Sequence, residues 1–162
     1  MMQFKKTEQA IALETTLAMS AIDVDFSPTR SPDSNGFDLR ACTDTVITIF
    51  PDEVVKIGTG VHVWLGVDED LPADLAWAGL LMPRSSSQGL ILNNTIGLLD
   101  YGYQGELIVK YRNITPEAIS IAPGDKFAQL VVVMTYINTM KQVEDFTTTT
   151  RRGENGFGST GN

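Results

Sequence analysis

The stretch TVITIFPDEVVKIGTGVHVWL, residues 45–65, decides the fold class. Its short runs rich in Val, Ile and Thr favour strands, and they are divided by Phe50-Pro51-Asp52-Glu53 and by glycines, which favour turns. The same texture extends outward from residue 20 to residue 140, with Pro, Gly, Asp and Asn at intervals of about ten residues. Several short strands without intervening helical periodicity predict an all-β sandwich or barrel.

The expected strands share this composition and have turn residues at their ends. They are residues 45–50, 54–58, 61–65, 76–82, 90–93, 105–113, 119–121 and 129–136. Residues 7–18 differ, because Ala10, Leu13 and Leu17 recur at helical spacing. That segment is a short amphipathic helix, an ordered tail that docks on a neighbour, or a partly disordered extension.

Length and composition restrict the classes of protein. At 162 residues and 43% hydrophobic, the chain is expected to form one domain. We expect an N-terminal extension over residues 1–19, a β-rich core over 20–140 and a C-terminal arm over 141–162. A net charge of -8 argues against stable nucleic-acid binding, which depends on Lys and Arg neutralising phosphates.

The sequence also restricts the kinds of metal site and argues against a membrane span. One cysteine, Cys42, and one histidine, His62, exclude an intrachain disulfide, a cysteine-based zinc cluster and a histidine-rich site, so any metal must be held by oxygen. No run approaches the roughly 18 apolar residues of a membrane span. We therefore expect no membrane partner and a cytoplasmic location, or the host cytoplasm if the protein is virally encoded.

Four polar segments carry residues suited to chemistry. Gly36 to Ala41 places the carboxylate of Asp38 at a strand entrance, where a turn role is the alternative. Pro83-Arg84-Ser85-Ser86 offers a cation and hydroxyls that can hold phosphate, although serines beside an arginine are also common in ordinary loops.

The third segment, residues 94–106, places Asp100 and Tyr103 at a glycine-flanked turn, where Asp100 is either a turn former or a group facing a ligand. The fourth, residues 152–161, combines a guanidinium, two hydroxyls and glycine backbone N–H groups that can wrap phosphate oxygens. Phe157 in this tail can stack on a base. A linker or simple disorder is the other interpretation of the tail.

In their order and chemistry these segments resemble the motifs of the trimeric, all-β dUTP pyrophosphatases, the dUTPase family, over residues 20–162. The five matching segments are Gly36 to Ala41, Pro83 to Ser86, Gly97 to Gly105, Pro123 to Leu130 and Arg152 to Gly161. The resemblance implies a distorted jelly-roll-like barrel subunit with a flexible C-terminal arm, assembled as a homotrimer whose active sites lie between subunits.

The activity implied is hydrolysis of dUTP to dUMP and pyrophosphate, which keeps uracil out of DNA and supplies dUMP for dTMP synthesis. Asp100 matches the catalytic aspartate, which activates a water for attack on the α-phosphate. Asn94 and the hairpin backbone match the groups that read uracil, Tyr103 the aromatic under the deoxyribose, and Phe157 the ring that closes over the base.

The remaining implied groups hold the triphosphate and its metal. The substrate-binding set is completed by Arg84, Ser85, Ser86, Gly97, Gln129, Arg152, Gly158, Ser159 and Thr160. Mg²⁺ is held mainly by the substrate phosphates, and Asp38 matches a position that holds one of its waters. The sequence departs from the family pattern at Gly102, Lys126 and Asn155, where an acidic residue, arginine and glycine are usual.

Two other functions stay open at this stage. A dCTP deaminase shares the fold and an Arg-Ser-Ser element, but it needs a glutamate near Val109 to Tyr111, where this chain has Lys110. A regulatory module is the second alternative, with a protein partner bound through residues 1–19 or through the acidic insert Val67 to Asp74.

Overall fold

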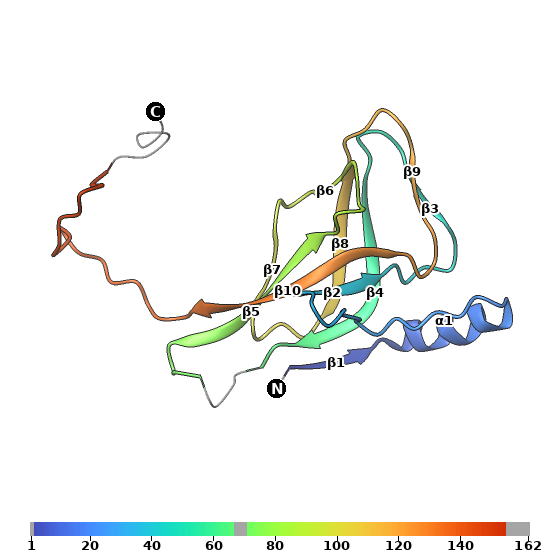
Figure 1. Ribbon diagram of the computed structural model, residues 1–162, viewed down its shortest axis with the longest axis horizontal. Helices are drawn as coiled ribbons and strands as arrows, with labels where there is room; N and C mark the ends of the chain where they lie inside the picture. Colours follow the sequence, from blue (N-terminus) through green and yellow to red (C-terminus); the bar gives the residue numbers. More distant parts are fainter. Residues whose placement is uncertain (1, 67–70, 155–162) are drawn as a thin grey trace.

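The computed structural model describes residues 2–66 and 71–154. Ten strands and one helix are found in these ranges, and two four-stranded sheets carry most of the strands (Figure 1). The strands are β1 (Gln3–Lys6), β2 (Gly36–Arg40), β3 (Ile47–Ile49), β4 (Val54–Trp64), β5 (Leu75–Pro83), β6 (Leu90–Leu92), β7 (Gly97–Leu99), β8 (Glu106–Asn113), β9 (Ile119–Ile121) and β10 (Lys126–Tyr136). The predicted all-β class is confirmed.

All strand pairs are antiparallel. One sheet has the order β1-β4-β8-β6, the other has β2-β10-β5-β7, and β3 pairs with β9. Alternate side chains of both sheets form the main core, as expected for two sheets packed face to face. The largest fully buried side chain is Tyr111, whose hydroxyl donates a hydrogen bond to the carbonyl of Phe127 at 2.8 Å.

The predicted strands are recovered with small shifts, and three short ones were not predicted: β1, β2 and β7. Residues 54–58 and 61–65, predicted as two strands, belong largely to the single strand β4, so that division was wrong. The register of β4 against β8 shifts between Gly58 and His62, and Gly60 has φ +70°. This is a β-bulge, which bends a strand without ending it.

The helix predicted over residues 7–18 is confirmed as α1 (Glu8–Met19). Thr7 caps it, since its hydroxyl accepts a hydrogen bond from the Ala10 N–H at 3.0 Å. Ala10, Leu13 and Leu17 are buried against a second, smaller cluster that contains Phe26 and Cys42. The N-terminal segment is therefore packed on the sheets, and the disordered alternative is wrong for residues 7–18.

The chain beyond β10 has a different character. Residues 137–154 are exposed throughout, and in Figure 1 this segment runs away from the sheets on the side opposite α1. Within the described ranges, the structure has no helix long and apolar enough to cross a membrane.

Candidate functional site

A carboxylate and two cations meet where β2, β5 and β10 converge. Asp38 on β2 accepts a hydrogen bond from Arg84 Nε at 2.7 Å and forms an ion pair with Lys126 Nζ at 2.9 Å. Strand β10 brings them together, because it pairs with both β2 and β5, and Gln129 lies opposite Asp38 and Met82. The sequence predicted Asp38 and Arg84 for the site but gave Lys126 no role beyond its departure from the family pattern.

The charge state of this cluster follows from its geometry. Burial raises the pKa of Asp38, but the hydrogen bond from Lys126 and the positive charges of Arg84 and Lys126 outweigh burial and lower the pKa below its ordinary value. Asp38 is therefore ionised at neutral pH. One anion between two cations leaves the cluster with an excess positive charge, which suits an anionic ligand.

Hydrogen bonds hold the loop after β5 against β10. Arg84 Nη1 donates to the Lys126 carbonyl at 2.9 Å and to the Ser86 hydroxyl at 3.2 Å. The Gln129 side-chain amide donates to the Pro83 carbonyl at 2.9 Å. Ser85 and Ser86 remain exposed, so their hydroxyls are accessible to a ligand.

A cavity of about 450 Å³ adjoins this loop and is lined in part by Arg84, Ser86 and Lys126. Arg40 also lines it, and its guanidinium donates to the Gly124 carbonyl at 2.8 Å. Sequence reasoning missed Arg40, although it lies within the first matching motif. The basic and hydroxyl groups around the cavity can hold phosphate oxygens.

A second group of predicted residues lies on the loop of residues 100–105 between β7 and β8, which belong to different sheets. This loop stands where the family resemblance implies a hairpin, and it is called the hairpin below. The Tyr103 N–H donates to the Asp100 carbonyl at 3.0 Å, and the Tyr103 hydroxyl donates to the Glu106 carbonyl at 2.8 Å. The side chains of Asp100 and Tyr103 are exposed. A Cβ atom on the buried Gly97 would lie 2.8 Å from Leu81 Cβ, so glycine lets β7 lie close against β5.

Asn94 lies in the turn before β7. Its carbonyl accepts from the Ile96 N–H at 2.8 Å, and Thr95 between them has φ +65°. The side chain of Asn94 is exposed. This turn and the hairpin flank β7, and both sets of polar groups are accessible to a ligand.

The hairpin lies level with the middle of β5, and the basic cluster lies at the C-terminal end of that strand. Leu99 pairs with Gly79, so Asp100 lies level with Ala78, whereas Arg84 follows the other end of the strand. The six residue steps from Ala78 to Arg84, at about 3.3 Å per step, separate the two by about 20 Å. One chain therefore does not bring the predicted catalytic aspartate beside the predicted phosphate ligands.

One of the predicted tail residues lies within the described ranges, and the others lie beyond them. Arg152 lies in the exposed segment beyond β10. Phe157, Gly158, Ser159 and Thr160 lie outside the described residues, as does Asn155. Among the described residues no group of three or more His, Cys, Asp or Glu could hold a metal ion.

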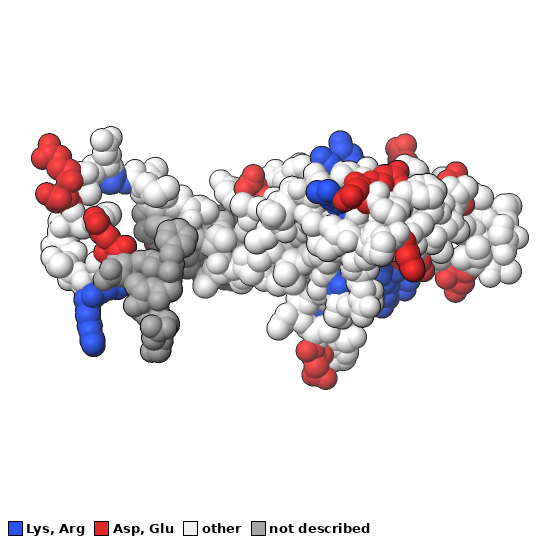
Figure 2. Space-filling model, turned by 90° about the horizontal axis from the view of Figure 1, so that it is seen from above, with Lys and Arg blue, Asp and Glu red and all other residues white. Residues whose placement is uncertain are grey.

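Figure 2 shows how charged side chains are distributed on one face of the molecule. On the face shown in Figure 2, the basic side chains gather in small groups next to acidic ones. Nucleic-acid binding proteins usually present a basic stripe or patch on one face.

Comparisons with known proteins agree with one another. A family model described as dUTPase matches residues 23–161. A deoxyuridine 5'-triphosphate nucleotidohydrolase of Idiomarina loihiensis is 43% identical over 131 residues, which cover 79% of this chain and 82% of that protein. The protein of the same description from Neisseria meningitidis serogroup A is 40% identical over the same shares of both chains.

Solved structures of similar fold are dUTPases as well. A mutant dUTPase of Staphylococcus bacteriophage 80alpha with dUpNHpp has a TM-score of 0.73 and 24% identity, over 99% of this chain and 98% of that one. A mutant dUTPase of phage phi11 of S. aureus, described with a structural Mg(II) ion, has a TM-score of 0.67 and 22% identity, over 91% and 99%. At these identities the likeness concerns the fold.

Proposed function

This chain belongs to the dUTPase family, and we propose that it hydrolyses dUTP to dUMP and pyrophosphate with Asp100 as the catalytic base. The observation that carries the proposal is the positively charged cluster of Asp38, Arg84 and Lys126 beside the exposed hydroxyls of Ser85 and Ser86. That arrangement suits a polyphosphate, and membership of the dUTPase family indicates that the polyphosphate is that of dUTP.

Each active site is proposed to use two copies of the chain in a homotrimer. The separation of about 20 Å between Asp100 and Arg84 along β5 is too large for both to contact the α-phosphate of one nucleotide. A neighbouring copy can place its hairpin beside this basic cluster, because a head-to-tail interface brings different surfaces of two copies together. A ring of three copies then contains three equivalent sites.

In the proposed site the nucleotide spans the interface. The hairpin backbone and Asn94 contact uracil, and Tyr103 packs under the deoxyribose. A donor and acceptor set that matches uracil leaves the amino group of cytosine facing a donor, and an unpaired buried group of this kind costs about 1–3 kcal/mol. This is the proposed basis for rejecting dCTP.

The phosphates lie over the loop after β5 in this proposal. Their oxygens accept hydrogen bonds from Arg84, Ser85, Ser86 and Gln129, and from Arg152, Gly158, Ser159 and Thr160 of the arm. Phe157 covers the base. Gln129 gives up its bond to the Pro83 carbonyl when it turns to the substrate.

The reaction is a displacement at the α-phosphorus. Asp100 accepts a proton from a water molecule, whose oxygen then attacks the α-phosphorus. The bond from that phosphorus to the oxygen bridging to the β-phosphate breaks, and pyrophosphate leaves with that oxygen. The cations around the phosphates stabilise the negative charge that develops on the leaving group.

The residues present fit a magnesium ion that binds through the substrate. In this proposal phosphate oxygens and waters supply most of its ligands, which suits an ion that dehydrates reluctantly. Both Asp38 oxygens are paired with cations, but a carboxylate has about four acceptor positions, so Asp38 can still accept a hydrogen bond from a metal-bound water. The ion, when bound, neutralises phosphate charge.

The test is pyrophosphate release with magnesium from dUTP, dCTP, dTTP and UTP in separate reactions. We expect rapid release from dUTP alone and loss of that release in Asp100→Asn, which keeps the size of the side chain but cannot accept the proton. Absence of release from dUTP by the wild-type protein refutes the proposed activity. Full activity of Asp100→Asn refutes only the proposed role of Asp100 and leaves the proposed activity standing.

A further inference from the structure

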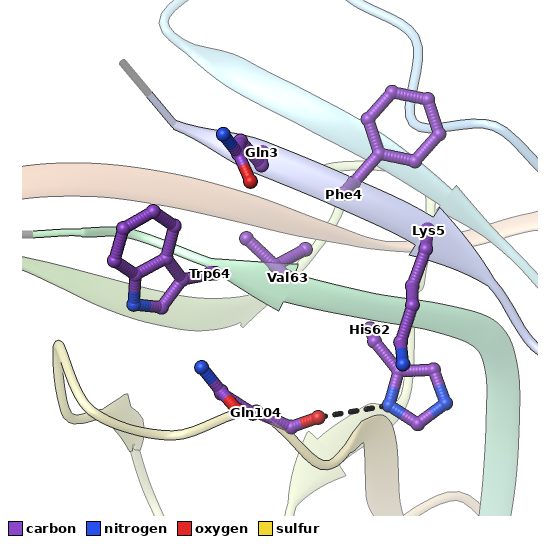
Figure 3. Close-up of a pocket in the computed structure, with 7 residues that line it drawn as sticks. All are labelled: Gln3, Phe4, Lys5, His62, Val63, Trp64 and Gln104. Atoms are coloured by element: carbon purple, nitrogen blue, oxygen red, sulfur yellow. Dashed lines mark hydrogen bonds between the residues drawn. The ribbon is translucent and has the colours of Figure 1, made fainter.

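The bulge of β4 touches the end of the active-site hairpin. The Gly60 N–H donates to Glu106 Oε1 at 2.8 Å, and His62 Nδ1 lies 2.9 Å from the Gln104 carbonyl oxygen, as the dashed line in Figure 3 shows. A carbonyl oxygen only accepts, so His62 Nδ1 carries the proton and donates. The first bond holds Glu106, which follows Gly105, and the second holds Gln104, which follows Tyr103. Both residues lie at the end of the hairpin.

The other side of the bulge is held by the N-terminal segment. The Thr7 N–H donates to the Gly60 carbonyl at 2.8 Å. A Cβ atom on Gly60 would lie 2.6 Å from Ala10 Cβ and 2.9 Å from Cys42 Sγ, and Ala10 is 0% exposed. The bulge is thus confined between α1 and the hairpin, with no room for a larger side chain at either Gly60 or Ala10.

An ionic network fixes α1 itself. Lys6 Nζ lies 2.8 Å from both Glu14 Oε1 and Asp25 Oδ1, and Glu14 Oε1 accepts the Phe26 N–H at 2.7 Å. The hydrogen bond from Lys6 lowers the pKa of Asp25. The network ties β1, α1 and the segment after α1 to one another, so a displacement of α1 is resisted at three points.

We propose that residues 3–19 position the active-site hairpin through the bulge of β4, and that His62 is a positioning residue for uracil recognition. The dUTPase family model matches only from residue 23, so α1 lies outside the part of the chain that the family pattern describes. The proposal rests on the proposed function, because the hairpin is where that function places uracil. It also gives a role to the extension that the sequence left open.

Positioning and simple support of the fold make different predictions. If these contacts only stabilise the fold, their loss lowers the unfolding temperature and leaves the folded enzyme with unchanged KM and selectivity. If they position the hairpin, their loss raises the KM for dUTP and reduces the preference for dUTP over dCTP. The preference for dUTP over dCTP is the deciding readout, because Asp100 lies on the same turn and its displacement lowers kcat as well.

The first experiment compares His62→Ala, His62→Asn and Lys56→Ala in the full chain. Loss of one hydrogen bond predicts about a three- to tenfold rise in KM for dUTP in His62→Ala, with a matching fall in selectivity. His62→Asn carries an amide N–H at the place of Nδ1 and should recover most of the effect. Lys56 is exposed on the same strand, away from the hairpin contacts, and serves as the control.

The second experiment displaces the bulge from the side of α1. Ala10→Val adds two methyl groups where Gly60 leaves no space, whereas Ala12→Val adds them on the exposed side of the same helix with the same loss of helix propensity. We expect a raised KM and reduced selectivity only in Ala10→Val, assayed below its unfolding temperature. If Ala10→Val does not fold, the His62 series alone decides the outcome.

A measurement without substrate separates this proposal from the proposed function. Hydrogen exchange of the Tyr103 amide, which is bonded to the Asp100 carbonyl, reports the order of the hairpin directly. Faster exchange in His62→Ala and Ala10→Val, but not in Lys56→Ala and Ala12→Val, supports positioning even if the wild type proves inactive on dUTP. Unchanged exchange, KM and selectivity in both test variants overturns it.

Discussion

Subunit mixing tests most directly whether two copies share one active site. The two variants are Asp100→Asn, which removes the proposed base, and Arg84→Ala, which removes a proposed phosphate ligand. Each alone should assemble into an inactive trimer. Because the two residues lie about 20 Å apart along β5, an intact site requires Asp100 from one copy and Arg84 from its neighbour.

The expected recovery follows from counting chains. After random exchange of equal amounts, each site draws its hairpin from an Arg84→Ala chain in half of the cases and its basic cluster from an Asp100→Asn chain in half of the cases. For independent choices in a closed head-to-tail ring, about one quarter of the sites are intact. If instead each chain supplied both residues to its own site, every site in every mixture would lack one of them.

The assay is pyrophosphate release from dUTP before and after mixing, with exchange verified by native mass spectrometry of differently tagged chains. Activity near a quarter of the wild-type value supports a shared site. Absence of activity in a sample that demonstrably contains mixed trimers refutes the shared site. A second control, the double variant mixed with wild type, shows whether the exchange procedure itself preserves activity.

Three further predictions follow from described contacts. The pKa of Asp38 is lowered in the folded protein, so its ionised form stabilises the fold above the pKa of about 3.9 that an unfolded aspartate has. This contribution is lost as pH falls through the folded pKa. Urea unfolding should therefore show Asp38→Asn less stable than wild type at pH 7, and the difference should shrink below about pH 4. Asn113 is 0% exposed and its side-chain amide donates to the carbonyls of Ile49 and Glu117, so Asn113→Ala should cost about 2–4 kcal/mol in urea unfolding, and a cost below about 0.5 kcal/mol would contradict this account. Removal of residues 151–162 should abolish most dUTP hydrolysis with little change in the unfolding temperature, since the described part of that segment is exposed, and calorimetry beside the activity assay checks both.

The sequence predicted strands where Val, Ile and Leu stand between turn residues, and it missed strands whose existence depends on their partners. β7 has three residues and β2 has five, and neither is distinguishable from a loop without β5 and β10 beside it. β4 was divided because Gly58 and Gly60 resemble a turn locally. The pairing of β4 with β8 and the packing of α1 convert those glycines into a bulge within one strand.

The site shows a similar limit. Local residue types identified Asp38, Arg84 and Asp100 as chemically capable groups, because charge and turn chemistry can be read within a few residues. Which of them lie together depends on strand register, and strand register cannot be read from a few neighbouring residues. The register places Asp38 beside Arg84 and leaves Asp100 level with Ala78, in the middle of β5.

The same geometry explains how lysine serves at position 126, where the resemblance described above predicts arginine. Arg84 makes the contacts that need a planar, branched group. Its Nε donates to Asp38, and its Nη1 donates to the Lys126 carbonyl and to Ser86. Lys126 contributes its backbone carbonyl to that arrangement and a single Nζ contact at 2.9 Å to the other oxygen of Asp38. A point charge on a flexible chain is sufficient for that contact. Position 84 therefore requires the shape of arginine, whereas position 126 requires only a positive charge within reach of the carboxylate.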